Sequence, residues 1–162
     1  MKIFLSTLMI AALATGIVAC SGKTEKADEN NAEQSETTPA KFSPNSVTIG
    51  VVDLDDDNIL RPGIETNHVI AIDFNATWCG PCQQFKPAFD AAAEKYAGEI
   101  EFISVDVDKN PETATAFEVT SIPHVVIIKP GTEPKDYQNY IGTGDLLPQE
   151  KFFEMLDKAN GK

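Results

Sequence analysis

Cysteine, histidine and basic residues are scarce in this chain of 162 residues. Its three cysteines and two histidines satisfy the count for a four-ligand zinc site, but His68 and His124 are far apart and no second ligand pair is clustered. The chain has 13 Lys and Arg against 25 Asp and Glu, a formal charge of −12. Such a surface argues against binding to nucleic acid or adhesion to anionic lipid. We therefore expect no metal, no cofactor and no nucleic-acid partner.

The first 19 residues carry one basic residue, Lys2, followed by a mostly apolar run that ends at Val18. This segment is too short and too lightly flanked for a typical membrane span, and it predicts a signal peptide. It ends in Ile17-Val18-Ala19-Cys20, which resembles the lipobox of bacterial lipoproteins. The resemblance implies cleavage before Cys20 and lipidation of that cysteine. The alternative is an ordinary secretory signal with a cysteine near its cleavage site.

The residues that follow predict a tether and then one domain. Residues 20–45 are polar, with Phe42 the only large apolar side chain, and cannot bury enough surface to offset ordering. We expect a signal peptide at 1–19, a lipidated N-terminus with a flexible linker at 20–45, and one compact domain at 46–162. Acyl chains on Cys20 would anchor the protein to a membrane of the bacterial cell envelope. The domain would then lie outside the cytoplasm, on the periplasmic side or at the surface.

The predicted domain alternates strands and helices, which indicates an α/β fold with a mixed sheet between helices. The predicted strands are Val47–Leu54, Val69–Ala76, Glu101–Val107, His124–Lys129 and Asp136–Ile141. The predicted helices are Cys82–Tyr96, kinked at Pro87, then Pro111–Phe117, capped by Asn110, and Pro148–Ala159, with a short helical segment before Asn67.

The most informative motif is Trp78-Cys79-Gly80-Pro81-Cys82, between an apolar strand and a helix. A two-residue spacer on a first helical turn brings the two sulfurs within bonding range. The free N–H groups and the positive end of the helix dipole favour a thiolate on the first cysteine. Pro81 suits this turn because its missing N–H costs nothing there. The motif predicts a reversible dithiol–disulfide switch.

From residue 47 to the C-terminus the chain resembles thioredoxin. Further motifs carry the resemblance in the same order: Asp73-Phe74 before the cysteines, Pro87 after them, Val105-Asp106-Val107-Asp108 with Asn110-Pro111, Val119 to Ile122-Pro123, and Tyr140-Ile141-Gly142. The resemblance implies a thioredoxin-like three-layer sandwich, in which helices flank a central mixed β-sheet.

The resemblance also implies a role for each matching residue. Cys79, nearer solvent, would be the nucleophile, and Cys82, one turn deeper, would resolve the mixed disulfide. Asp73 matches a buried carboxylate with a raised pKa that accepts the Cys82 proton, although it could be only structural. Pro123 matches a cis-proline beside the disulfide, the alternative being an ordinary trans turn. The residues expected to line the substrate surface are Trp78, Gly80, Pro81, Ile122 and Gly142.

Three positions depart from the family pattern. Ser104 stands where a lysine is often found near the buried carboxylate, so Asp73 should hold its proton more tightly. Gln83 replaces a lysine that commonly follows the second cysteine. His124 follows the predicted cis-proline, where threonine is common. Two alternatives are open for His124: its charge tunes the thiolate, or it is a structural strand residue.

These observations predict a membrane-tethered thiol–disulfide oxidoreductase that reduces disulfides of exported proteins and receives electrons from a membrane donor. The alternatives are a disulfide oxidase or isomerase, a cytochrome c maturation reductase, and a non-catalytic adaptor with a thioredoxin fold. Cytochrome c maturation reductases usually have a helix and a strand inserted after the active-site helix, where only residues 97–101 lie here. An adaptor would have no need of the two cysteines. We expect a monomer.

Overall fold

The computed structural model describes residues 42–133 and 136–162. The predicted signal peptide, Cys20 and most of the predicted linker lie outside the described residues. Phe42, at the end of that predicted linker, packs against the hydrophobic core. Within the described ranges, no helix has both the length and the apolar character needed to cross a bilayer.

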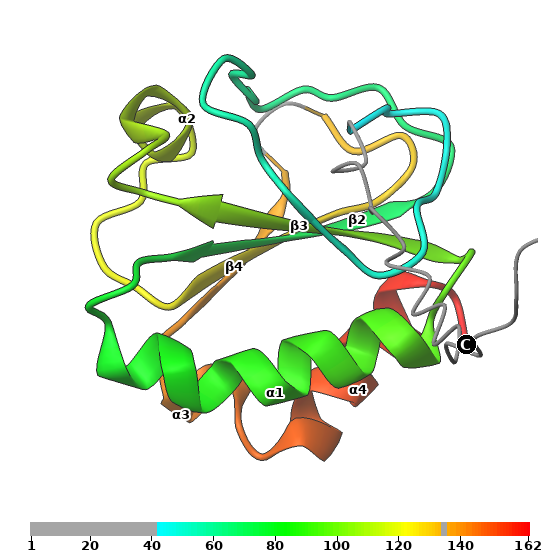
Figure 1. Cartoon of the computed structure of the whole chain (residues 1–162). Helices are drawn as coiled ribbons and strands as arrows, with labels where there is room; N and C mark the ends of the chain where they lie inside the picture. Colours follow the sequence, from blue (N-terminus) through cyan, green and yellow to red (C-terminus); the bar gives the residue numbers. More distant parts are fainter. Residues whose placement is uncertain (1–41, 134–135) are drawn as a thin grey trace, which may run out of the picture. The chain divides into compact units, whose positions relative to one another are not determined.

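A five-stranded mixed β-sheet forms the centre of the described domain (Figure 1). Its strands are β1 (Val51–Asp53), β2 (Val69–Asn75), β3 (Ile100–Asp106), β4 (His124–Ile128) and β5 (Gln138–Ile141), in the order β1-β3-β2-β4-β5. Strands β1 and β2 run parallel to β3, whereas β4 runs antiparallel to both β2 and β5. The central strand β2 is therefore paired on both sides.

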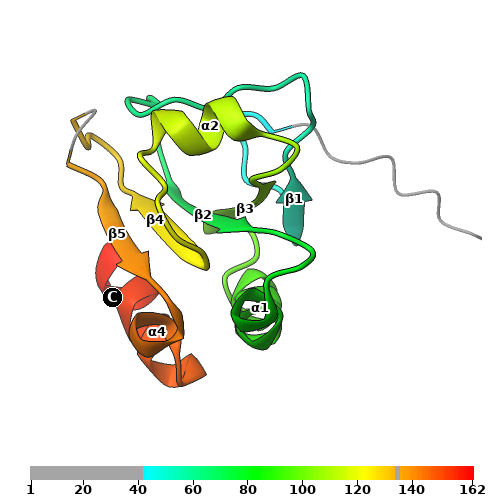
Figure 2. The same cartoon turned by 90° about the vertical axis from the view of Figure 1, so that its left-hand side faces the viewer.

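Helices cover both faces of this sheet (Figure 2). On one face lie α1 (Gly80–Lys95), α3 (Thr143–Leu146) and α4 (Gln149–Ala159). On the other face lies α2 (Pro111–Ala116), together with the segment between β1 and β2. The expected three-layer sandwich with a central mixed sheet is confirmed.

The burial of β2 explains its sequence. Every residue from Val69 to Phe74 is buried, because helices cover both faces and neighbouring strands pair with both edges. Alternate residues point to opposite faces, so Ala71 packs with α1 and α4 while Ile72 packs with α2. Asp73 is the one acidic residue in this strand, and it belongs to the face that α1 covers.

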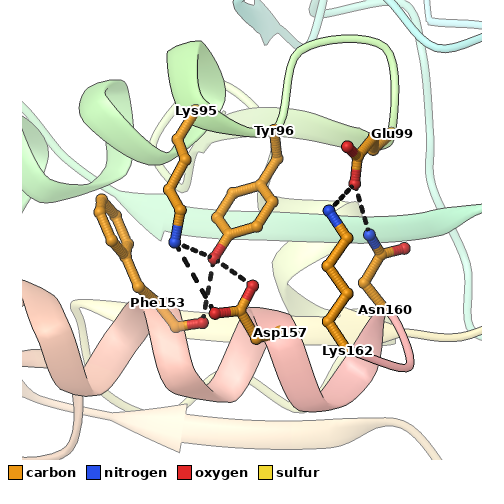
Figure 3. Close-up of polar contacts among 7 residues, drawn as sticks. All are labelled: Lys95, Tyr96, Glu99, Phe153, Asp157, Asn160 and Lys162. Carbon is orange, nitrogen blue, oxygen red and sulfur yellow. Dashed lines mark hydrogen bonds and ion pairs between the residues drawn. The ribbon is translucent and has the colours of Figure 1, made fainter.

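Polar contacts hold α4 and the C-terminus against the end of α1 that is remote from the cysteines (Figure 3). The hydroxyl of Tyr96 donates to Asp157 Oδ1 at 2.7 Å and accepts from Lys95 Nζ at 2.7 Å. Lys162 Nζ donates to Glu99 and forms an ion pair with it. These groups position α1 without taking part in the chemistry at its other end.

The structure corrects two expected elements before β2. The strand expected at Val47–Leu54 is only Val51–Asp53. The short helix expected before Asn67 is absent from the described residues between β1 and β2, where Pro62 lacks an N–H and Gly63 has a φ of +94°. This segment is held instead by Leu60, whose backbone N–H donates to Thr113 Oγ1 at 3.1 Å.

Further differences lie around α2 and α3. Asn110 is the N-cap residue of α2 but makes no capping hydrogen bond with its side chain. Its buried side-chain amide donates to the Leu54 carbonyl at 3.4 Å. Helix α3 was not expected, and it follows Gly142, whose φ of +74° is accessible to glycine. The Leu147–Pro148 peptide bond is cis, which the sequence did not indicate. The link from α1 to β3 contains no inserted helix or strand, in contrast to the usual pattern of cytochrome c maturation reductases.

Candidate active site

The two cysteines of the motif form a disulfide at the start of α1. Cys79 is the N-cap residue of the helix, with φ −82° and ψ 99°, and its Cα lies 5.3 Å from that of Cys82. The backbone N–H of Cys82 donates to Cys79 Sγ at 3.1 Å. In the reduced protein this N–H and the helix dipole favour a thiolate on Cys79.

The expectation that Cys79 lies nearer solvent than Cys82 is wrong for this oxidised form. Both residues are 4% exposed, because the disulfide is enclosed in a small cluster with Ala76 and is covered by Val107 and Ile122. The two cysteines differ instead in their inner surroundings. Only Cys82 lines the cleft that reaches the buried carboxylate, whereas the Cys79 sulfur accepts the helix N–H.

The loop before β4 lies beside the disulfide. The Ile122–Pro123 peptide bond is cis, and Ile122 packs against the cysteine cluster. The backbone N–H of Gly142 donates to the Pro123 carbonyl at 2.8 Å, so the end of β5 is tied to this loop. The structure thus brings Ile122, Pro123 and Gly142 together beside the cysteines.

The remaining expected surface residues surround the disulfide on the solvent side. Gly80 and Pro81 are exposed in the first turn of α1. Trp78 is 68% exposed, and its indole N–H donates to Asp108 Oδ2 at 2.7 Å. This hydrogen bond fixes the ring while leaving most of it available to a partner.

Asp73 lies on the inner side of the motif and is 5% exposed. Burial raises the pKa of this carboxyl from 3.8 to about 7, as the sequence predicted in direction. The amide of Asn75 and the charge of Lys86 act to lower the pKa, and Asp90 acts to raise it. The carboxyl can therefore hold or release a proton near neutral pH, as a proton acceptor must.

A cleft of about 500 Å³ joins this carboxyl to the second cysteine. Asp73 and Cys82 both line it, together with Ser104, which is the register partner of Asp73 on β3. Asp73 Oδ1 is buried and has no hydrogen-bond partner among the protein atoms. Water within this partly polar cleft could carry a proton between the thiol of Cys82 and the Asp73 carboxyl.

Ser104 and Gln83, which differ from the family pattern, each form contacts near the second cysteine. Ser104 supplies a hydroxyl instead of a cation at the cleft, so Lys86 on α1 is the basic side chain that lowers the Asp73 pKa. The side-chain amide of Gln83 donates to the Thr77 carbonyl at 2.8 Å. Gln83 therefore stabilises the loop before the cysteines without adding charge.

His124 faces the core between the sheet and α2, on the opposite face from α1. Its ring lies edge-on to Phe74 at 6.0 Å, and Phe74 also contacts Phe117 at the end of α2. His124 Nε2 forms a hydrogen bond with Asn139 Oδ1 at 2.8 Å. These contacts favour a structural role for His124 in the strand over tuning of the thiolate. In the described residues, His, Cys, Asp and Glu side chains form no group of three or more suited to a metal ion.

Two residues of the site were missed in the sequence. Asp108 stands in a motif that supports the resemblance, but its contact with Trp78 was not foreseen. Asn75 donates to the carboxylate of Asp73, which lies two positions earlier on the same strand. Because alternate strand residues share a face, the spacing of Asp73 and Asn75 was a signal for this contact.

Comparison with known proteins agrees with this geometry. The family model described as Thioredoxin matches residues 41–150. Thioredoxin of Staphylococcus aureus is 37% identical over 110 residues, which are 68% of this chain and 95% of that protein. The crystal structure of chloroplastic thioredoxin z has a TM-score of 0.51 and 28% identity, covering 59% of this chain and 81% of that one.

The fold and the cysteine pair define a dithiol–disulfide protein, and the chain belongs to the thioredoxin family. With Cys79 and Cys82 at the CxxC position, it is a thiol–disulfide oxidoreductase.

Proposed function

We propose that this oxidoreductase is tethered to a membrane and reduces disulfides of exported proteins. The observation that carries the proposal is the Cys79–Cys82 pair at the N-terminus of α1, joined by a cleft to Asp73, whose pKa is about 7. This arrangement supports an attacking thiolate on one cysteine and a proton acceptor for the other. The Gly80-Pro81 spacer is typical of reductants in this family.

The reaction begins with both cysteines reduced. The Cys79 thiolate attacks one sulfur of the substrate disulfide, and the other substrate sulfur leaves as a thiolate that takes a proton from solvent. Cys82 then gives its proton to Asp73 and attacks the Cys79 sulfur, which breaks the bond between Cys79 and the substrate. The second substrate sulfur leaves as a thiolate and takes a proton from solvent. The substrate leaves with two thiols, having gained two electrons, and the protein is left with its Cys79–Cys82 disulfide.

The exposed surface supports binding of an extended segment of substrate. Trp78 and Ile141 are 68% and 44% exposed, and Gly80 and Pro81 lie exposed over the disulfide. Ile122 offers backbone groups beside the cysteines, as expected for recognition of an extended chain. Each turnover leaves the disulfide form, so a donor must return two electrons. For a domain outside the cytoplasm, we propose a donor in the membrane.

The proposal of a membrane tether rests on the sequence Ile17-Val18-Ala19-Cys20 and on the polar residues that follow it. A flexible linker of this length would extend about 25–30 Å on average, and up to about 80 Å when stretched. Acyl chains on Cys20 would hold the protein at the membrane while the linker lets the domain reach substrates near its surface.

We expect Cys20→Ser to release the protein from the membrane. Serine cannot form the thioether to diacylglycerol, so the variant should lose both membrane sedimentation and incorporation of labelled palmitate. The purified variant should reduce insulin at the unmodified rate, because Cys20 is not part of the Cys79–Cys82 pair. Ser21→Ala, which changes the next residue but keeps the cysteine, is the matched control and should stay in the membrane fraction. Palmitate labelling of Cys20→Ser would contradict the proposed anchor.

A further inference from the structure

The side-chain amide of Asn75, which lines the cleft, bridges two strands. Its Nδ2 is 3.2 Å from Asp73 Oδ2 and 3.2 Å from the Asp73 carbonyl oxygen on β2. On β3 it is 3.1 Å from Ser104 Oγ. Ser104 on β3 is paired with Asp73 on β2, so the Asn75 amide contacts both residues.

These contacts make the two oxygens of the Asp73 carboxyl unequal. Oδ2 accepts an N–H from Asn75, whereas Oδ1 is buried and has no protein partner. A carboxyl oxygen that already accepts an N–H is the less favourable place for a proton, because the unprotonated oxygen is the better acceptor. The proton of the neutral acid therefore belongs on Oδ1.

We propose that Asn75 is a positioning residue for the dithiol reaction, because it holds Asp73 Oδ2 so that Oδ1 exchanges the proton with Cys82. The proposal rests on the dithiol chemistry of the proposed function, in which the Cys82 thiol must lose its proton. When Cys82 attacks the mixed disulfide, its S–H bond breaks and the proton passes to Oδ1, through water in the cleft. The S–S bond between Cys79 and the substrate breaks as the Cys79–Cys82 bond forms, and the substrate sulfur takes the electron pair.

Asn75 also sets the range of pH over which Asp73 works. Burial raises the pKa of Asp73 to about 7, and the hydrogen bond from Asn75 acts in the opposite direction because it stabilises the carboxylate. Without this donor the carboxyl would keep its proton to higher pH and would accept one from Cys82 less readily. Serine at position 104 adds no positive charge, so the amide and Lys86 are the groups that lower the pKa of Asp73.

The other charged groups near Asp73 lie on α1, β1, β3 and the loop after β3. Helix α1 contributes Lys86 and Asp90, which act on the Asp73 pKa in opposite directions. Strands β1 and β3 contribute Asp53 and Asp106, and the loop after β3 contributes Lys109. Replacing Asn75 with an uncharged residue leaves all of these in place, so the hydrogen bond is tested separately from the charges.

The test is Asn75→Leu, which keeps the side-chain shape but removes the donor. In the oxidised protein, a ¹³C NMR titration of the Asp73 carboxyl should show a pKa higher by about one unit. The pH profile for reduction of insulin should move to alkaline pH by the same amount. Ser104→Ala is the matched control: it removes the other acceptor and leaves the amide on Asp73, so the Asp73 pKa should stay the same or fall slightly.

An Asp73 pKa in Asn75→Leu within 0.3 of the unmodified value, a margin of roughly 0.4 kcal/mol, would overturn the proposal. Asn75→Ala serves as a second variant if leucine prevents folding, and the same shift is expected. The NMR titration does not depend on turnover. Failure of the unmodified protein to reduce insulin would therefore count against the proposed function, whereas an unchanged titration in an active Asn75 variant would count against the positioning role alone.

Discussion

Cys79→Ser should reduce the turnover of insulin disulfides to the background rate, a loss of at least about a thousandfold. The Cys79 sulfur lies at the N-cap of α1 and is the atom that forms the mixed disulfide in the proposed reaction. A serine hydroxyl is not ionised at neutral pH and cannot form a disulfide. The helix should survive the change, because serine is among the preferred N-cap residues and can accept the same Cys82 N–H.

Cys82→Ser is the informative partner of this variant. It keeps the attacking thiol but lacks the resolving one, so mixed disulfides with substrates should accumulate and be visible on a non-reducing gel. In cells, the proteins captured in this way should be exported proteins that carry disulfides. Circular dichroism would confirm the fold of both variants. Turnover by a folded Cys79→Ser protein would show that another group performs the attack.

Asp73→Asn should stabilise the oxidised protein at pH 8 by up to about 4 kcal/mol. The pKa of Asp73 is about 7 in the folded protein and 3.8 as the ordinary value. Between these values the native state retains a proton that the unfolded state has lost. Stability of the unmodified protein therefore falls as the pH rises from about 4 to about 7, and stays at the lower level above that window. An amide at position 73 does not ionise and removes this penalty.

The measurement is urea unfolding of both proteins from pH 4 to pH 8. The difference in unfolding free energy should be small at pH 4 and should grow until about pH 7. Asp53→Asn is the matched control, because Asp53 lines the same cleft but is exposed. This control should not reproduce the pH-dependent gain. A constant difference between Asp73→Asn and the unmodified protein across the range would mean that burial does not perturb the carboxyl.

The central part of the fold was accessible from the sequence because it depends on strong local patterns. The continuous apolar run of β2 predicts a buried strand, and the CxxC motif after it predicts the start of a helix. Both predictions depend on local sequence alone. The residues before β2 were harder to predict. Leu60 is buried and its backbone bonds to Thr113, which lies 53 positions later, so local preference did not decide that segment.

The candidate site was predictable in composition but less so in detail. The positions of Cys79, Cys82 and Asp73 follow from one strand and the helix after it, and so does the direction of the Asp73 pKa shift. The equal burial of the two cysteines depends on Ile122 and other residues that reach them only through tertiary packing.

The surroundings of His124 and the contacts of Asn75 depend on how the strands pair. The side chain of His124 faces α2 because β4 pairs antiparallel with β2 and sets it opposite Phe74. The bridge from Asn75 to Ser104 requires the parallel register of β2 and β3. Neither register can be read from the separate strands.

The most direct test of a reductase is the equilibrium reduction potential of the Cys79–Cys82 pair in the purified protein, measured against defined thiol–disulfide buffers. We predict a value near that of thioredoxins, about −270 mV, at which the dithiol readily gives its electrons to substrate disulfides. A value near the oxidising end of the family range, about −120 mV, would contradict reduction as the physiological direction and would favour an oxidase or isomerase. Absence of a reversible two-electron couple would contradict the dithiol mechanism itself.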